Sequence, residues 1–369
     1  MLGIQTKIKH ILFRSLVRKS IMKFPQKGVH ALIIKSYLNK VKKILLSDRK
    51  KWNLGWLLTP PNPLAIWTYR FFVDVNPNHL GNWSTQPNAH GGTQKLEQEN
   101  IQALIDLYHA DKSHLEGYIT SGGTEGNLFS VWAGNAYLKK HCTTEKICLL
   151  HTSLTHYSVV KAAHIANVDI KITPLNSSTW SMDPDALVFS LHHLSLKGYR
   201  GFLIPLTLGY TLTGTSDHID DIIKKINKFH RTHPHIRCYL WIDAALNGLI
   251  TPFISTRFTP FQSRLINTIV VDFHKFGGTP YPAGVILYRR RLRKLIEKPI
   301  DYLPDHDNTV LGSRPGAAAA SIWTMIQLNG VDGFKTKVYK QKTILKYFLQ
   351  RVLRIFPHAH IIDLLRNFP

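Results

Sequence analysis

Lys275 lies at the end of a run of apolar and β-branched residues, and this position predicts a chemical role for its side chain. The run Thr268–Phe273 predicts a buried strand, and two glycines, Gly277 and Gly278, follow it closely. A lysine at the end of a core strand is costly to bury unless its charge is paired or its nitrogen is covalently occupied. A desolvated lysine loses its proton and becomes a nucleophile that forms Schiff bases. Lys275 is therefore a candidate nucleophile.

The turn Ser121–Asn127, with the sequence Ser-Gly-Gly-Thr-Glu-Gly-Asn, lies between a predicted strand and a predicted helix. Such a turn offers free backbone N–H groups and the positive end of a helix to an anion. Its glycines would let the backbone approach a phosphate closely, and Thr124 adds a hydroxyl donor. The competing interpretation is a glycine-rich turn that binds nothing.

Asp243 and His156 also lie at or just beyond the ends of predicted strands. A carboxylate at the end of a strand would keep a pyridine nitrogen protonated, although Asp243 would equally well cap the next helix. His156 would stack on a cofactor ring, but with 20 histidines in the chain it needs support from its neighbours. The support is the order of turn, histidine, acid and lysine at strand ends. Together they complete one cofactor site, and pyridoxal phosphate is the usual covalent occupant of such a lysine.

Short apolar runs alternate with helical stretches through the middle of the chain. Strands are predicted at 118–120, 147–150, 168–172, 201–208, 238–242 and 268–273, and helices at 96–109, 128–140 and 219–230. This alternation predicts an α/β fold with a mostly parallel sheet covered by helices on both faces. We expect four parts: a basic amphipathic leader (1–51), an N-terminal arm with little regular structure (52–95), a large cofactor-binding domain (96–296) and a small, helical C-terminal domain (297–369).

The leader carries much of an unusual positive charge. The chain has 47 lysines and arginines against 23 acidic residues, a net charge of +24, and Asp48 is the only acid within residues 1–51. Apolar residues recur there at helical spacing, which predicts two amphipathic helices broken near Pro25 and Gly28. In order of preference, the leader packs against protein, lies on an anionic membrane surface, or contacts nucleic acid. No apolar run is long enough to cross a membrane.

The three cysteines, Cys142, Cys148 and Cys238, lack the spacing of a metal site or of a disulfide framework. We therefore expect no metal site and a reducing compartment, which is the cytoplasm. A location at the periphery of a membrane is the alternative.

The motifs resemble those of the pyridoxal-phosphate-dependent group II amino-acid decarboxylases, most of all the histidine/serine decarboxylase branch. The resemblance covers roughly residues 76–340 and rests on Ser121–Asn127, His156–Ala163, Asp243–Ala245, His274–Phe276 and Asp301–Arg314. It implies fold type I, the aspartate-aminotransferase-like transferase fold, in a homodimer whose active sites lie at the subunit interface. A loop tyrosine of that family, which reaches the site from the neighbouring subunit as a catalytic residue, would correspond to Tyr302.

The resemblance also implies a role for each candidate. Lys275 would hold the cofactor as a Schiff base, Asp243 would pair with the pyridine nitrogen, and His156 would stack on the ring. The phosphate would be held by Gly123, Thr124 and His274. The expected reaction is the decarboxylation of an L-amino acid, with an imidazole or aromatic side chain preferred.

Several positions depart from the family pattern, and they leave other functions open. Tyr210 replaces a small hydroxyl residue, and Asp272-Phe273 replaces a small or polar pair. The segments Asn78–Trp83 and Arg314–Ala317 differ from the histidine branch, and the small domain, which stops at Pro369, is expected to be shortened. The alternatives are a carbon–carbon lyase that acts on a phosphorylated amino-alcohol, and a non-catalytic relative that binds a membrane or partner through its leader.

Overall fold

The computed structural model describes residues 30–49, 60–81, 92–142, 146–255, 258–301, 305–359 and 361–362. The chain divides between residues 58 and 59 into two units, and helix α2 (Ala31–Arg49) is the element described in the first. This helix lies where the second amphipathic helix of the leader is predicted, whereas the first lies outside the described residues. None of the described helices is both long and apolar enough to cross a membrane. What the leader binds stays a prediction.

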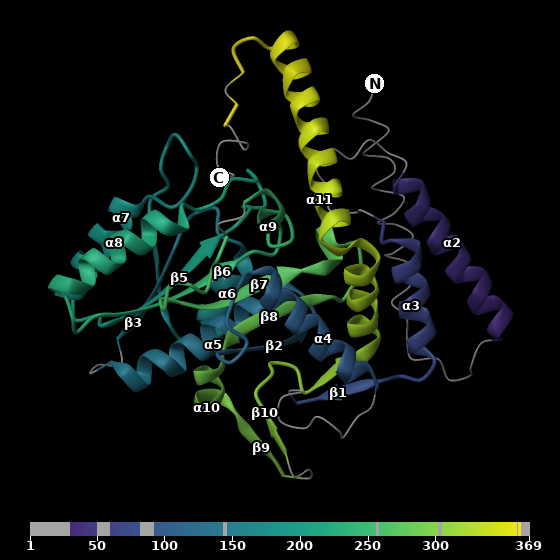
Figure 1. Ribbon diagram of the computed structural model, residues 1–369, viewed down its shortest axis with the longest axis horizontal. Helices are drawn as coiled ribbons and strands as arrows, with labels where there is room; N and C mark the ends of the chain where they lie inside the picture. Colours follow the sequence, from purple (N-terminus) through teal and green to yellow (C-terminus); the bar gives the residue numbers. More distant parts are fainter. Residues whose placement is uncertain are drawn as a thin grey trace. The chain divides into compact units, whose positions relative to one another are not determined.

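A seven-stranded sheet forms the centre of the second unit (Figure 1). Its strands, in spatial order, are β2 (Leu115–Thr120), β8 (Gly284–Arg289), β7 (Ile266–Asp272), β6 (Arg237–Asp243), β5 (Gly201–Thr207), β3 (Ile147–His151) and β4 (Asp169–Ile172). All neighbours pair in parallel except β8, which is antiparallel to both β2 and β7. The carboxyl ends of the parallel strands therefore meet at one edge, where an open α/β sheet places its ligands.

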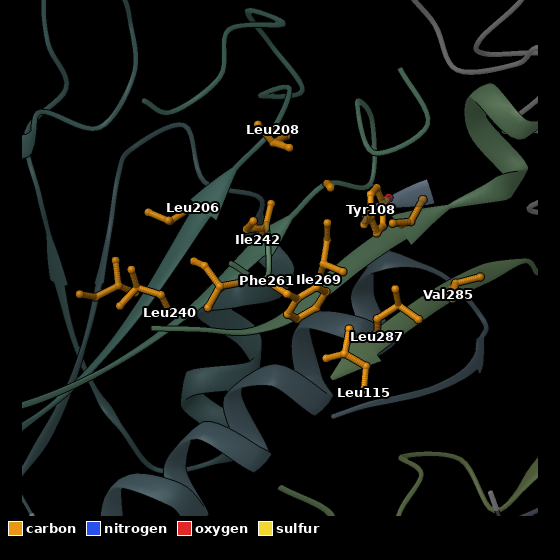
Figure 2. Packing of buried hydrophobic residues seen from close by; sticks show 14 of the residues in the cluster. Tyr108, Leu115, Leu206, Leu208, Leu240, Ile242, Phe261, Ile269, Val285 and Leu287 are labelled. Atoms are coloured by element: carbon orange, nitrogen blue, oxygen red, sulfur yellow. The ribbon is translucent and has the colours of Figure 1, made fainter. Parts of the chain in front are cut away.

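Helices cover both faces of the sheet because its strands are apolar on both sides (Figure 1). In β6, Leu240 and Ile242 join the core on one face, and Tyr239 and Trp241 join the core on the other. Figure 2 shows the first of these cores, with Ile242 beside Ile269 of β7. The helices on that face are α4 (Gly92–Leu107), α7 (Pro184–Leu196), α8 (Ile219–Thr232) and α11 (Gly316–Ile355). The opposite face is covered by α5 (Gly123–His141), α6 (Tyr157–Ile165) and α10 (Arg293–Ile296).

The α/β fold predicted from the sequence is confirmed, and each of the six predicted strands is present as β2 to β7. The sequence analysis missed β8. This strand follows a short helical turn, η1 (Phe273–Gly277), and pairs antiparallel with the strand just before that turn. Its apolar run resembles its parallel neighbours, so its direction depends on the tight connection and not on its composition.

The prediction that residues 52–95 have little regular structure is wrong for the described part of that arm. Helix α3 (Pro63–Val73) begins after Asn62, whose side chain accepts a hydrogen bond from the Leu64 N–H, and Pro63 has the fixed φ that suits a first helical position. Its buried face packs on α11, where the Thr68 and Thr324 hydroxyls are 3.0 Å apart. The arm then pairs β1 (Asn78–Leu80) with β11 (Ser313–Pro315).

The remaining short elements are α9 (Thr251–Ile254), η2 (Arg290–Leu292), β9 (Lys298–Ile300) and β10 (Asp305–Asp307). The strands β9 and β10 form an antiparallel pair ahead of α11, so the region from residue 297 is not purely helical as predicted. The boundaries predicted between the arm, the large domain and the small domain stay predictions.

A buried charge cluster ties the arm to the sheet. Glu97 of α4 is fully buried and receives hydrogen bonds from Arg314 Nη1, from His79 Nδ1 at 3.0 Å and from the Ile119 N–H at 2.7 Å. Arg314 also donates to the Gly81 carbonyl at 2.6 Å, so one guanidinium joins β11, α4 and the arm. Burial acts to raise the pKa of Glu97, but the charges and hydrogen bonds of Arg314 and His79 outweigh it and lower the pKa to about 2.

Replacing Glu97 by glutamine should destabilise the fold at neutral pH by about 3–5 kcal/mol, because it leaves Arg314 buried without its counter-charge. The folded-state pKa of Glu97, about 2, lies below the ordinary 4.5. Its stabilising contribution is therefore fully present above the ordinary value and is lost as the pH falls toward the folded value.

The free energy of urea unfolding should be measured for the wild type and for Glu97→Gln from neutral pH down to about 3. The difference in this free energy between the two proteins should become smaller as the pH falls. Glu99→Gln on the same helix is the control, because Glu99 is exposed. A gap that does not change with pH would contradict this account of Glu97.

Candidate functional site

The predicted site residues lie at the edge of the sheet where the parallel strands end. Asp243 is the last residue of β6, and Asp272 is the last residue of β7. Lys275 follows in η1, and the turn before α5 connects to the end of β2. The fold thus brings three chain segments to one edge because their strands are neighbours or near neighbours in the sheet.

Lys275 and Asp272 form a buried ion pair at the centre of this edge. The Lys275 Nζ atom lies 3.0 Å from Asp272 Oδ2, and the lysine side chain keeps 17% of its surface exposed while that of Asp272 keeps 3%. His274 Nε2 lies 3.4 Å from the same carboxylate oxygen. Burial acts to raise the pKa of Asp272, but the hydrogen bond from His274 and the charge of Lys275 lower it overall. Asp272 therefore stays ionised and places a counter-charge beside the amine.

The turn before α5 approaches this pair through its glycine backbone. Gly122 has a φ of +144°, which glycine adopts readily, and a Cβ there would lie 2.8 Å from His274 Cε1. A Cβ on Gly123 would lie 3.2 Å from Asp272 Oδ2. Because α5 begins at Gly123, its first N–H groups lack partners within the helix and are suited to an anion. The role of Gly123, Thr124 and His274 as phosphate contacts stays a prediction.

Asn127, one turn into α5, joins the other two predicted residues. Its Nδ2 donates to Asp243 Oδ2 at 2.8 Å and to Ser158 Oγ at 3.0 Å, while its Oδ1 accepts from Trp241 Nε1 at 3.0 Å. Ser158 Oγ in turn lies 2.7 Å from His156 Nδ1. One buried amide therefore orients both the acid and the histidine.

His156 caps α6 and is held in a defined tautomer. Its Nδ1 accepts hydrogen bonds from the Ser158 N–H and hydroxyl, so a single proton belongs on Nε2. Burial lowers the pKa of His156; the charge of Asp243 opposes this effect and the charge of Lys275 adds to it. The ring is therefore neutral near pH 7, as a ring that stacks on an aromatic cofactor should be.

The contacts show which predicted residues lie together. Asn127 joins Asp243 to Ser158, which contacts His156, while Lys275 follows β7, the strand next to β6 in the sheet. Tyr302 lies outside the described residues, and its role stays a prediction. Tyr210 is buried and donates its hydroxyl to Asp217 at 2.8 Å, so it belongs to the packing beneath the site.

Sequence analysis missed the roles of Asn127 and Ser158, although both lie in the quoted motifs. The signal available for Asn127 is its place one helical turn after Gly123, which puts it on the face of α5 that covers the sheet. Asp272 was noted as a departure, and the structure pairs it with Lys275.

The residues present fit pyridoxal phosphate. The fit lies in a lysine amine that is partly accessible, a carboxylate at a strand end, a neutral imidazole and a glycine cradle that a Cβ would fill. Lys275 would hold the aldehyde carbon, Asp243 the pyridine nitrogen, and the start of α5 the phosphate. Asp272 adds negative charge near the phosphate, which His274 and Lys275 offset.

Comparison with known proteins supports this chemistry. The family model "Pyridoxal-dependent decarboxylase conserved domain" matches residues 81–362. The chain is 29% identical over 293 residues to tryptophan decarboxylase of Clostridium sporogenes, covering 77% of this chain and 68% of that protein. It is also 29% identical over 345 residues to L-aspartate/L-glutamate decarboxylase of Pyrococcus horikoshii, covering 90% and 82%. A third relative, histidine decarboxylase of Vibrio anguillarum, is 29% identical over 281 residues, covering 76% and 69%.

A solved structure shows the same fold. L-methionine decarboxylase from Streptomyces sp. 590 superposes with a TM-score of 0.78 at 18% identity, covering 90% of this chain and 82% of that chain. At this identity the likeness shows the fold alone, and it confirms the predicted fold type I.

Replacing Asn127 by alanine should lower kcat for amino-acid decarboxylation by about tenfold to a hundredfold. The change removes a hydrogen bond from the charged Asp243, worth about 1.5–3 kcal/mol, and frees Ser158 from its donor. The pH profile of kcat should shift as well, because the environment of His156 changes.

Asn135→Ala on the same helix is the matched control, since Asn135 donates only to the Ala166 carbonyl, at 3.3 Å. Steady-state kinetics of carbon dioxide release measure both variants. An unchanged kcat in Asn127→Ala would remove the positioning role.

Proposed function

We propose, on the premise that this chain belongs to the pyridoxal-dependent decarboxylase family, that Lys275 carries its cofactor and that Asp243 and His156 act on it. The chain is a pyridoxal-phosphate-dependent amino-acid decarboxylase. The observation that carries the assignment of roles is the Lys275 Nζ atom, 3.0 Å from Asp272, at the same edge of the sheet as Asp243, which Asn127 and Ser158 connect to His156.

Each residue has a distinct task in this proposal. The cofactor, when bound, supplies a protonated ring that accepts the electrons of the breaking bond between Cα and the carboxylate. Asp243, oriented by Asn127, keeps the ring nitrogen protonated. His156 would stack on the ring as a neutral imidazole with its proton on Nε2, and it or Tyr302 would direct a proton to the α-carbon.

Asp272 and His274 prepare the amine of Lys275. The carboxylate keeps the lysine side chain oriented through the ion pair, and His274 shares the negative charge of Asp272. The start of α5 and His274 hold the phosphate. Lys275 at one end and the start of α5 at the other would hold the cofactor in a fixed position.

We assign as substrate an L-amino acid with an imidazole or aromatic side chain. The charges that act on His156 include the carboxylates of Asp243 and Asp272. Two lysines also act on His156. Lys275 would be bound to the cofactor, and the Nζ atom of Lys161 lies 5.2 Å from the centre of the Tyr157 ring. A second carboxylate on the substrate would therefore meet acidic neighbours. Tryptophan and histidine decarboxylases are among the relatives, and an equally similar L-aspartate/L-glutamate decarboxylase makes the acidic amino acids the competing class.

A homodimer with shared active sites completes the proposal, and the cytoplasm is its compartment. Helix α3 supports the dimer, because Leu64, Trp67 and Phe71 remain exposed on the face turned away from α11. The Trp67 and Phe71 rings stack with centroids 5.2 Å apart, which makes a flat apolar surface for a second copy. Free thiols at all three cysteines suit a reducing compartment.

Purified protein should release carbon dioxide and the amine from histidine or an aromatic amino acid in a panel that also contains aspartate, glutamate and methionine. Borohydride should fix the cofactor to Lys275, as located by peptide mass spectrometry. Lys275→Ala should lose the fixed cofactor and lower kcat by about 10³-fold or more.

Lys298→Ala, at an exposed strand residue, is the control and should keep both properties. Release of an aldehyde without carbon dioxide would favour the carbon–carbon lyase, and preference for aspartate would overturn the substrate class. Fixation to a different lysine would refute the role of Lys275.

The double variant Trp67→Glu and Phe71→Glu should shift the protein from two chains to one in size-exclusion chromatography with light scattering. Buried aromatic anchors each contribute about 2 kcal/mol or more to an interface, so the dissociation constant should rise by at least about a hundredfold. Activity should fall with the dimer if the sites are shared.

The control is Phe189→Glu with Leu196→Glu, which places the same charges on exposed apolar positions of α7. A wild-type protein that is a single chain at all concentrations, or a control that dissociates equally, would contradict this interface.

A further inference from the structure

A strongly cationic pocket lies at the edge of the sheet opposite the decarboxylase site. It has a volume of about 530 Å³ and lies beside the ends of β8 and η2. We call it the arginine pocket, and its cationic residues are Arg264, Arg289, Arg290, Arg291, Arg293 and Lys294. None of the roles assigned to the decarboxylase site uses these residues.

The distance between the two sites follows from the length of β7. This seven-residue strand begins at Ile266, next to the pocket, and ends at Asp272, in the decarboxylase site. At about 3.3 Å per residue the two ends lie about 20 Å apart. β8 runs in the opposite direction, so it starts at Gly284 near the decarboxylase site and delivers Arg289 to the pocket. The arginine pocket is therefore a separate site.

The carboxylates beside the pocket balance only part of its charge. Glu116 is buried and pairs with Arg290 Nε at 3.1 Å and Arg293 Nη1 at 2.9 Å. Glu297 lies 3.5 Å from Arg293 Nε. Among the described residues, Arg264, Arg289, Arg291 and Lys294 form no ion pair with a carboxylate. His114 also lines the pocket and lies 3.6 Å from Asp111. Within the described part of the chain, three carboxylates therefore lie beside six cationic side chains and one histidine, and the pocket keeps a clear excess of positive charge.

Arg289 gives the pocket a rigid base. Its guanidinium donates to the carbonyls of Ile266 at 2.7 Å, Ser263 at 2.7 Å and Phe261 at 2.9 Å, and it lies over the ring of Phe261, which Figure 2 shows in the core. These bonds hold the loop before β7 against Arg289 and fix the orientation of its guanidinium group. Burial, followed by the charges of Arg291 and Arg264, lowers the pKa of Arg289 to about 10. The cations of this pocket repel one another, and an anion among them would relieve that repulsion.

Arg291 and Lys294 have room to contact such an anion. Arg291 uses Nη2 to donate to Asn267 Oδ1 at 2.8 Å, and the side chain remains exposed, as do those of Arg264 and Lys294. Guanidinium groups present forked N–H donors that match two phosphate oxygens at once, and they bind phosphate without a change of protonation. The geometry and the charge both suit phosphate groups.

We propose that the arginine pocket binds a small polyanion that carries two or more phosphate groups. The excess of positive charge exceeds what a single phosphate would neutralise, and a cavity of about 530 Å³ has the size of a small-molecule site. An extended nucleic acid is the less favoured occupant, because the anchored arginines line a concave pocket and not a flat stripe. The bound anion screens the repulsion around Arg289 and stabilises the start of β7.

Inorganic tripolyphosphate is the probe that tests this proposal. Isothermal titration of the full chain saturated with pyridoxal phosphate, in about 150 mM salt, should show saturable binding at one site per chain, and the melting temperature should rise with the probe. Arg264→Gln with Lys294→Gln should weaken binding by about tenfold or more, because it removes two charges from the pocket. Circular dichroism and the melting temperature without probe report whether this variant folds.

The control is Lys335→Gln with Lys340→Gln on α11, which removes the same charge from exposed positions outside the pocket. It should bind the probe as the wild type does. Equal weakening in both variants would show diffuse attraction to a basic protein and overturn the site. Absence of saturable binding by the wild type would also overturn it, as would binding of a uridine 20-mer in place of tripolyphosphate, which would indicate a nucleic-acid surface. If the pocket variant fails to fold, Arg291→Gln tested against the same control decides the question.

Discussion

The hydrogen bonds of Asn127 are the interaction on which the catalytic arrangement depends. One amide accepts from Trp241 and donates to Asp243 and Ser158, so its oxygen and both of its N–H groups are hydrogen-bonded in a buried site. Because an unmet polar group there is costly, the amide cannot rotate without losing several bonds at once. The acid at the end of β6 and the imidazole that caps α6 are therefore held in one geometry by a side chain that need not touch the substrate.

Acidic and basic side chains lie close together at the edge of the sheet around this amide, and those next to Lys275 offset one another's charge. Asp272 faces Lys275 and His274, while the glycine turn brings the positive start of α5 against them. At the opposite edge of the sheet, the positive charges are only partly offset. There the arginines outnumber the carboxylates, and Arg289 is held in place by carbonyl groups and by the ring of Phe261. The same sheet thus presents a neutralised polar site at one end of its strands and uncompensated positive charge at the other.

The sequence was sufficient for the strands and for most of the candidate site, because both depend on local signals. Apolar runs predict the parallel strands. Asp243 and Lys275 stand out because they are charged residues that lie at or just after the ends of such runs. It was insufficient for β8, whose direction is set by a tight connection, and for α3, whose apolar face becomes buried only against α11. The partners of Glu97 were also hidden, since Arg314 lies 217 residues away in the chain.

By itself the sequence determined the α/β fold, the glycine turn for a phosphate, and the identity of a lysine, an acid and a histidine able to serve one cofactor. These properties belong to side-chain chemistry and to the period of the apolar pattern, which act over a few residues. Only the tertiary structure decided that Asn127 lies within 2.8 Å of an acid 116 residues away, that Asp272 pairs with Lys275, and that six cations surround one cavity. The physical reason is that crossover connections, and not neighbouring residues, choose which strand ends meet.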